Sequence, residues 1–148
     1  MLEVAVVGCG HWGPNLARNF SQLPDSRVAA ICDLDWNKLD RALRLAPETR
    51  TSTDYREIID HDAVNAVAIA TPASTHFEIA RECLLRGKHV FVEKPMCLTA
   101  VEAAALVDLA RTRGRVLEAA ERSLHDGGCL VSVASHSAAA RTGTPGGE

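Results

Sequence analysis

Three glycines near the N-terminus follow a short β-branched run at a fixed spacing. The segment Val4–Gly13 reads V-A-V-V-G-C-G-H-W-G, which contains the pattern G-x-G-x-x-G at Gly8, Gly10 and Gly13. In such a turn the first glycine permits a tight bend, the second lets the backbone approach a pyrophosphate, and the third lets the helix pack on the strand. Pro14 suits the first turn of that helix, whose free N–H groups attract phosphate. The pattern predicts a phosphate-binding turn, although glycine-rich turns also occur without a ligand.

An acidic residue follows the next apolar run. Val28–Cys32 is apolar and ends in Asp33, which lies twenty residues after Gly13. At about this distance from a dinucleotide-binding turn, a carboxylate accepts hydrogen bonds from the adenosine ribose. Asp33 could instead only cap a turn. Because the strand, the turn, the helix and the acidic residue occur in the right order, the ribose role is the favoured interpretation.

Composition restricts the class of protein. The chain has 148 residues, of which 47% are hydrophobic, and a formal net charge of −3. These values suit one soluble domain with a substantial core and argue against a nucleic-acid surface. No apolar run approaches the roughly 20 residues of a membrane helix, and the N-terminus resembles a strand rather than a signal peptide. The five cysteines form an odd number without C-x-x-C, which predicts reduced, mostly packing cysteines in a cytoplasmic protein.

Strand and helix signals alternate along the chain. This alternation predicts an α/β fold with a doubly wound, mainly parallel sheet of the Rossmann type. We expect strands near residues 2–7, 28–33, 50–53, 64–70 and 89–92, and helices near 14–22, 36–46, from 54, from 75 and from 99. Two of the helices start with T-x-x-E, which predicts capping boxes at Thr75–Glu78 and Thr99–Glu102. Glycine at positions 87 and 114 would end these two helices.

The composition changes near the C-terminal end. Residues 1–117 are expected to form the Rossmann domain. Residues 118–148 contain few large apolar groups, and only Leu130, Val131 and Val133 cluster in a way that suits a strand. Such a composition predicts an irregular, disordered tail, and it is also what a shifted reading frame in a GC-rich gene would produce.

Two polar segments follow the fourth and fifth expected strands. The first runs from Ala70 to His76 as A-T-P-A-S-T-H, and the second is E-K-P at residues 93–95. Ligands of open α/β sheets bind beyond the carboxyl ends of the strands, so both segments should face the same crevice as the glycine turn. Taken alone, Lys94 would be a solvated lysine and His76 a helix residue without a ligand. The remaining histidines have no ligand-like spacing, so no metal site is expected; they include His61, His89, His125 and His136.

Together, three segments resemble the Gfo/Idh/MocA family, the relatives of glucose–fructose oxidoreductase and inositol dehydrogenase. The segments are G-C-G-H-W-G-P-N, A-T-P-A-S-T-H-F-E-I-A and V-E-K-P-M, and the resemblance covers about residues 2–117. It implies an NAD-dependent dehydrogenase domain that oxidises sugar or cyclitol hydroxyls. The form of Trp12–Phe20 is most similar to members that act on nucleotide-linked amino sugars or uronic acids.

The resemblance also implies a role for each matching residue. The expected cofactor-binding residues are Gly8, Gly10, His11, Trp12, Gly13, Asp33, Thr71, Pro72, Thr75, His76, Glu93 and Lys94. Lys94 would be the catalytic group, because a lysine near the nicotinamide can hydrogen-bond the reacting alcohol oxygen as its proton leaves. The peptide bond between Lys94 and Pro95 is a candidate for the cis form. Asp33 and Asp35, with no arginine nearby, favour NAD over NADP.

Family members have a second part that these 148 residues do not contain. They are more than twice as long, and a second α/β domain supplies most of the substrate pocket, the oligomer interface and a histidine that assists proton transfer. In this chain the resemblance stops within the sixth expected strand, near residues 116–120. We therefore expect a domain that binds NAD and is inactive alone. The alternatives are a non-catalytic nucleotide-binding module and a gene remnant.

Overall fold

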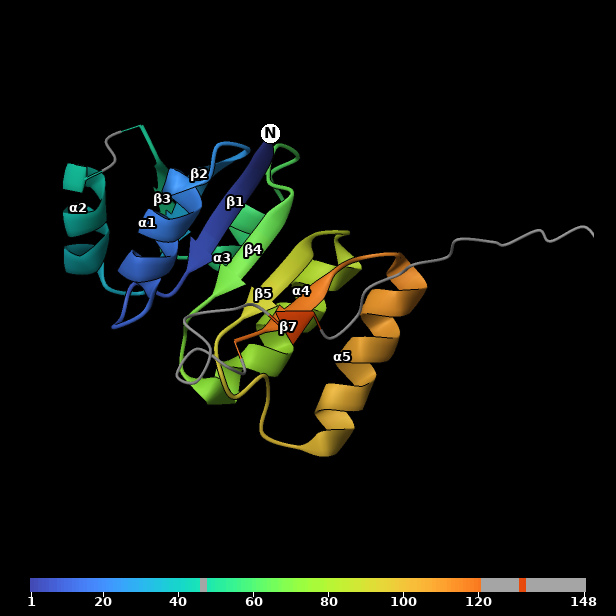
Figure 1. Ribbon diagram of the computed structural model, residues 1–148. Coiled ribbons are helices and arrows are strands. Elements are labelled where there is room, and N and C mark those ends of the chain that lie inside the picture. The colour runs from blue at the N-terminus through green and yellow to red at the C-terminus, as the bar shows by residue number, and fades with distance from the viewer. Residues whose placement is uncertain (46–47, 121–130, 133–148) are drawn as a thin grey trace, which may run out of the picture.

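One sheet organises the molecule. The computed structural model describes residues 1–45, 48–120 and 131–132. The strands lie in the order β3-β2-β1-β4-β5-β6-β7 (Figure 1). They are β1 (Leu2–Val7), β2 (Ser26–Cys32), β3 (Arg50–Ser52), β4 (Ala66–Ile69), β5 (His89–Val92), β6 (Leu117–Ala119) and β7 (Val131–Ser132). Strands β1 to β6 are parallel and β7 is antiparallel to β6. This is the dinucleotide-binding order, in which the direction of winding reverses between β1 and β4, and it confirms the predicted Rossmann-type sheet.

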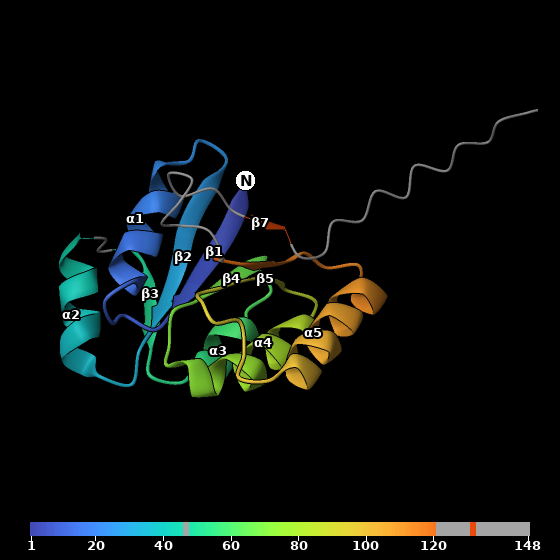
Figure 2. The same ribbon diagram turned by 60° about the horizontal axis from the view of Figure 1, so that its bottom comes forward.

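Helices cover both faces of the sheet. They are α1 (Gly13–Gln22), α2 (Trp36–Leu45), α3 (Tyr55–Ile59), α4 (His76–Leu85) and α5 (Ala100–Arg113), with a short 3₁₀ helix, η1 (Ala73–Thr75), before α4. Helices α1 and α2 lie on one face, and α3, α4 and α5 lie on the other (Figure 2). Each of the five helices expected from the sequence is present at its predicted place.

Alternation along β1 explains the two layers. Val4 and Val6 are buried against α1 and α2, while Ala5 and Val7 are buried against the opposite helices. Side chains of a strand point alternately to its two faces, so a strand covered on both sides must be apolar throughout. The same reasoning holds for β4, where Val67 belongs to one cluster and Ala68 to the other.

Of the two capping boxes predicted from the sequence, the structure contains the one at the start of α5 but not the one at the start of α4. At α5, Thr99 Oγ1 accepts a hydrogen bond from the Glu102 N–H at 3.2 Å, and the Glu102 carboxylate accepts one from the Thr99 N–H at 3.1 Å, so the predicted capping box is confirmed. The capping box predicted at Thr75 is wrong. The η1 turn puts the Thr75 backbone in a helical conformation, and its side chain caps nothing. Glu78 instead pairs with Arg56 at 3.3 Å.

The sheet continues past residue 117. Strand β6 pairs with β5, and both Leu117 and Ala119 are buried. Strand β7 lies within the apolar cluster that the sequence identified at Leu130–Val133 and pairs with β6. The rest of the expected tail, residues 121–130 and 133–148, lies outside the described residues. Among the described helices, none has the length and apolar character that spanning a membrane requires.

The core of the α3–α5 face supplies a stability prediction. Leu106 on α5 is 0% exposed, whereas Val101 on the same helix is 80% exposed. Leu106→Ala should lower the free energy of unfolding by about 2–5 kcal/mol, because it removes buried methyl groups and leaves a cavity. Val101→Ala should change it by no more than about 0.5 kcal/mol. Urea unfolding of both variants tests this, and equal effects would contradict the assigned orientation of α5.

Candidate functional site

The three glycines of the turn differ in what surrounds them. Gly8 has a φ of +98°, and a Cβ there would lie 2.7 Å from the Ala70 carbonyl. A Cβ on Gly13 would lie 1.9 Å from the Gly8 oxygen. Gly10, by contrast, has no atom within 4 Å of its ideal Cβ position. The first and third glycines are therefore required by the fold, while Gly10 leaves open space against the backbone.

That open space lies beside the start of α1. Trp12 occupies the N-cap position but its side chain caps no N–H group, and Pro14 lies in the first turn. The first N–H groups of a helix lack intrahelical partners and carry a partial positive charge, which favours an anion. His11 and Trp12 are exposed beside the turn, with their rings edge to face at 5.3 Å. The residues present thus fit a pyrophosphate: open backbone, an uncapped helix end and no acidic side chain in the first turn.

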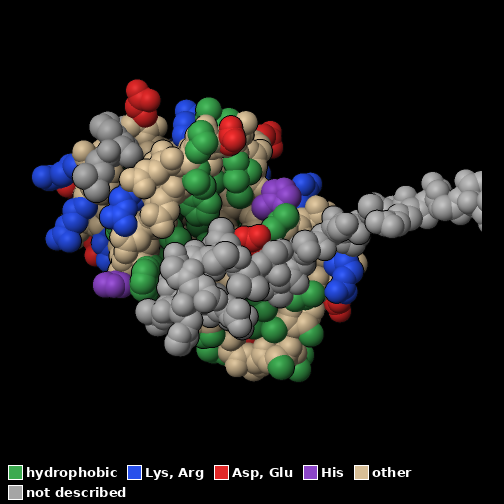
Figure 3. All heavy atoms as spheres, viewed as in Figure 1, with side chains coloured by type: hydrophobic (Ala, Val, Ile, Leu, Met, Phe, Trp, Pro, Cys, Tyr) green, Lys and Arg blue, Asp and Glu red, His purple; other side chains and the backbone are tan. Residues whose placement is uncertain are grey.

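Asp33 is held close to the same turn. Its carboxylate accepts a hydrogen bond from the Cys9 N–H at 2.6 Å and another from the Asp35 N–H at 2.9 Å. The side chain is only 10% exposed, and Lys38 Nζ lies 3.4 Å from Oδ1. Lys38 comes from the first turns of α2, around which basic side chains gather in Figure 3. Sequence reasoning missed this lysine, since it considered only arginine as a cation near Asp33.

Two large apolar residues, Leu34 and Trp36, follow Asp33 closely in the sequence. Leu34 is 88% exposed and Trp36 is 62% exposed. Sequence reasoning also missed these residues, although large apolar residues directly after a strand were a usable signal. They give the acidic site an apolar border of the kind that a flat aromatic ligand group contacts.

The cysteines near the turn are packing residues. Burial, with a smaller contribution from the nearby Asp33 carboxylate, raises the pKa of the Cys9 thiol to about 12. Burial likewise raises the pKa of Cys32 to about 12. Both thiols therefore stay protonated near neutral pH, and neither is a nucleophile there.

The segment after β4 lies against the glycine turn. A Cβ on Gly8 would lie 2.8 Å from the Thr71 nitrogen, so the two loops touch. Thr75 Oγ1 lies 2.8 Å from Thr71 Oγ1 and 2.8 Å from the Pro72 oxygen. The Thr75 hydroxyl can donate to the Pro72 carbonyl and accept from the Thr71 hydroxyl, which ties the loop into one turn.

His76 lies beneath this loop. Its side chain is 1% exposed. Nδ1 lies 2.8 Å from the Pro95 oxygen, and Nε2 lies 2.8 Å from the Thr71 oxygen. The ring therefore joins the segment after β4 to the segment after β5, with both nitrogens occupied by backbone.

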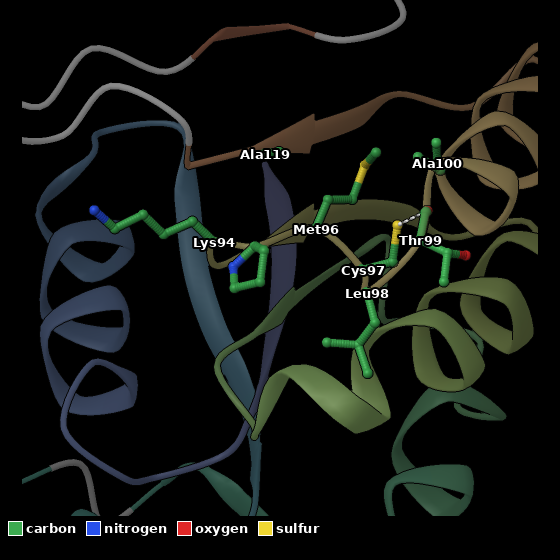
Figure 4. A pocket seen from close by; sticks show the side chains of 9 residues that line it. Lys94, Met96, Cys97, Leu98, Thr99, Ala100 and Ala119 are labelled. Atoms are coloured by element: carbon green, nitrogen blue, oxygen red, sulfur yellow. Dashed lines mark hydrogen bonds between the residues drawn. The ribbon is translucent and has the colours of Figure 1, made fainter.

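The segment after β5 carries Lys94 to the surface. The Glu93 N–H donates to the Ile69 oxygen at 2.9 Å, and the bond between Lys94 and Pro95 is cis, as expected. Lys94 is exposed. A cavity of about 340 Å³ lies next to it; its lining is Lys94, Pro95, Met96, Cys97, Leu98, Thr99, Ala100, Ala103 and Ala119. In Figure 4 the Lys94 side chain points away from Cys97 and Thr99. Its ammonium group can therefore approach a ligand that lies outside this cavity.

The polar segments leave the same edge of the sheet. The N–H groups of Gly8 and Ala70 donate to the last carbonyls of β2 and β1, at 2.8 Å each. The Glu93 N–H makes the corresponding bond to β4. The glycine turn, the β4 segment and the β5 segment therefore start side by side at the carboxyl edge, as the sequence predicted. An anion site, a carboxylate and a lysine along one edge of the sheet have the chemistry to bind a dinucleotide and act on a hydroxyl at its far end.

Comparisons with known proteins agree with this geometry. The family model described as an oxidoreductase family with an NAD-binding Rossmann fold, GFO_IDH_MocA, matches residues 2–121. Glycosyl hydrolase family 109 protein 2 of Shewanella sp. strain ANA-3 is 36% identical over 123 residues, which are 77% of this chain and 27% of the relative. The chain thus spans about a quarter of the length of the curated relatives it matches.

Solved structures show the same fold. GenD2 from gentamicin A biosynthesis, in complex with NAD, is 36% identical with a TM-score of 0.76; the match covers 80% of this chain and 34% of GenD2. KijD10, a 3-ketoreductase from Actinomadura kijaniata in complex with NADP and TDP-benzene, is 28% identical with a TM-score of 0.75; the match covers 80% of this chain and 36% of KijD10. The family match, the strand order and the open glycine turn lead to one conclusion: this chain belongs to the Gfo/Idh/MocA oxidoreductase family, and residues 2–121 match its NAD-binding Rossmann domain.

Proposed function

We propose that this domain holds NAD for the oxidation of a secondary hydroxyl on a sugar, cyclitol or nucleotide sugar. The observation that carries the proposal is the open backbone at Gly10 beside the uncapped start of α1, with Asp33 held next to it by the Cys9 N–H. A pyrophosphate fits the first feature and a ribose fits the second. The substrate class is supported by the relatives named glycosyl hydrolases and by the 3-ketoreductase bound to TDP-benzene.

The parts of the cofactor would lie along the crevice in a set order. The backbone of Gly10, His11 and Trp12 would bind the pyrophosphate, with Gly8 and Gly13 shaping the turn. Asp33 would accept from the ribose hydroxyls, and the exposed faces of Leu34 and Trp36 would border the adenine. The Thr71–Thr75 turn and Glu93 would border the nicotinamide end.

We propose that NAD is preferred over NADP. The two relatives described above differ, since GenD2 holds NAD and KijD10 holds NADP. In this chain the Asp33 carboxylate would meet a 2′-phosphate directly. Lys38 lies 3.4 Å from it but is already paired with that carboxylate, so it does not supply a free positive charge.

Lys94 would be the group that acts on the substrate. Bound nicotinamide supplies the hydride acceptor. The Lys94 ammonium would donate a hydrogen bond to the hydroxyl oxygen of the substrate and stabilise the negative charge that develops there as the proton leaves. Glu93 and the buried His76 would fix the backbone on either side of it.

A second domain would complete the active site. The residues described here provide one wall, because Lys94 is exposed, as are Pro95, Leu98 and Thr99 of the neighbouring cavity lining. Holding a substrate in the reacting geometry accounts for as much as about 7–11 kcal/mol of a barrier in favourable cases. We therefore propose that turnover needs the additional protein that family-length chains carry, and that this chain by itself binds a cofactor without catalysis.

A second candidate function follows from the curated relatives, which are named glycosyl hydrolases. The same site could serve the cleavage of a glycosidic bond with transient oxidation of a neighbouring hydroxyl, as in NAD-dependent glycosidases. The two candidates share the roles of Asp33 and Lys94. They differ in outcome, since oxidation accumulates NADH and glycoside cleavage releases a sugar without net NADH.

The glycine turn gives the first test. Gly10→Val should weaken NADH binding by at least about 100-fold, or about 2.7 kcal/mol, because its side chain fills the space the pyrophosphate needs. Its melting temperature should match that of the wild type, since no atom lies within 4 Å of the new Cβ. Gly13→Ala is the contrasting variant and should lose the fold, because its Cβ would overlap the Gly8 oxygen. Normal NADH binding by Gly10→Val in a fluorescence titration would place the phosphate site elsewhere.

The acidic residue gives the second test. Asp33→Asn keeps the shape and one acceptor but removes the charge and frees Lys38 from its ion pair. We expect the ratio of NADPH to NADH affinity to rise by about tenfold, or about 1.4 kcal/mol. Asp40→Asn is the control, because Asp40 is an exposed α2 carboxylate paired with Arg44. Tighter binding of NADPH than of NADH by the wild type would reject the cofactor preference.

The third test addresses chemistry. The wild-type chain alone should show no turnover of inositol, glucose or nucleotide sugars, and fusion to a family-type second domain should produce activity. In the fusion, Lys94→Ala should lower the turnover number by about 10²–10⁴-fold, the usual contribution of proton-transfer catalysis. Arg111→Ala, on the exposed part of α5, is the control. Parallel assays of NADH and released sugar decide between the two candidate functions, and an active Lys94→Ala fusion would remove Lys94 from the mechanism.

A further inference from the structure

His76 is a buried polar side chain to which the proposed chemistry gives no direct contact. It is 1% exposed, and its two ring nitrogens each lie 2.8 Å from a backbone carbonyl oxygen, those of Pro95 and Thr71. The two carbonyls belong to different segments of the site. One follows β4 and touches the glycine turn, and the other directly follows Lys94.

The chemistry of the two partners restricts the protonation of the ring. A carbonyl oxygen only accepts hydrogen bonds, whereas neutral imidazole has one N–H group and one lone pair. A neutral ring would therefore place a nitrogen lone pair 2.8 Å from one of the two oxygens. Both hydrogen bonds form only when each nitrogen carries a proton.

Within the described residues, the ion pairs do not include the His76 ring. The ionisable side chains next to it along the chain are Glu78, Arg81 and Glu82 on α4, and Glu93 and Lys94 after β5. Glu78 and Glu82 are engaged with Arg56, at 3.3 Å and 2.9 Å. Because His76 starts α4, the helix dipole disfavours a positive charge there. Within the described residues, the two carbonyl oxygens are the groups that stabilise the charged ring.

We propose that His76 is a positioning residue: as a doubly protonated ring it clamps the Lys94 segment to the Thr71 segment and so sets the site for cofactor and hydroxyl. This inference rests on the proposed function for its purpose, because the clamp positions Lys94 relative to the loop that borders the nicotinamide.

Nitrogen NMR of the ring tests the clamp without any cofactor. The full chain, labelled with ¹⁵N-histidine, should show both ring nitrogens of one histidine protonated at neutral pH, with slow exchange of their hydrogens. That signal should disappear in His76→Phe, which assigns it. A neutral, single-tautomer ring for His76 at neutral pH would overturn the proposal.

NADH titration of the full chain tests the consequence. His76→Gln keeps donors for one carbonyl, so it should bind NADH about fivefold more weakly than the wild type, the effect of one ordinary hydrogen bond. His76→Phe keeps the ring shape but no donor, so it should bind NADH at least about tenfold more weakly than the wild type.

A matched control separates positioning from stability. Ile79→Val, on the same helix and 6% exposed, should lower the melting temperature but keep the wild-type NADH affinity. If His76→Phe binds NADH within twofold of the wild type, the clamp has no positioning role. If the wild type binds no NADH, the proposed function fails, while the ring NMR still decides the state of His76.

Discussion

The contact between the glycine turn and its neighbours is the constraint on which the rest of the structure depends. The turn passes so close to the β4 segment and to the start of α1 that a Cβ on Gly8 or Gly13 would overlap backbone atoms. This closeness brings α1 down onto the sheet at the point where the winding reverses. The helix start, the Asp33 carboxylate and the β4 segment then lie next to one another, because each leaves the sheet at the same edge.

Charge distinguishes the two ends of this edge of the sheet. At one end the Asp33 carboxylate is almost buried and held by two backbone N–H groups, with Lys38 as a partial counter-charge. A few strands away, Lys94 is exposed and carries a positive charge toward solvent. Between them lies the uncapped helix start. A dinucleotide, which has hydroxyls at one end, phosphates in the middle and a reactive ring at the other, matches this sequence of charges.

Hydrogen bonds across the loops hold the second half of the site. The Glu93 N–H bonds to β4, and the His76 ring joins the two segments beneath the surface. Polar groups buried in this way are costly unless each finds a partner. The positions of the Thr71 and Lys94 segments are therefore coupled, and neither segment is an independent loop.

The sequence by itself determined the doubly wound parallel sheet, the helices, the structural need for glycine at Gly8 and Gly13, and the capping box at Thr99, because these follow from local spacing and from the rules for parallel sheets. Local patterns failed at Thr75, where a 3₁₀ turn gives the backbone a helical conformation. The Thr75 hydroxyl there bonds to Thr71 and Pro72, and Glu78 pairs with Arg56. They also missed Lys38, Leu34 and Trp36, and for His76 they left open a ligand contact or a helix residue without a ligand. Only the tertiary structure shows the contacts and the exposure of these side chains. Each depends on which atoms distant in the chain come within hydrogen-bonding distance or remain uncovered, and spacing along the sequence does not encode that.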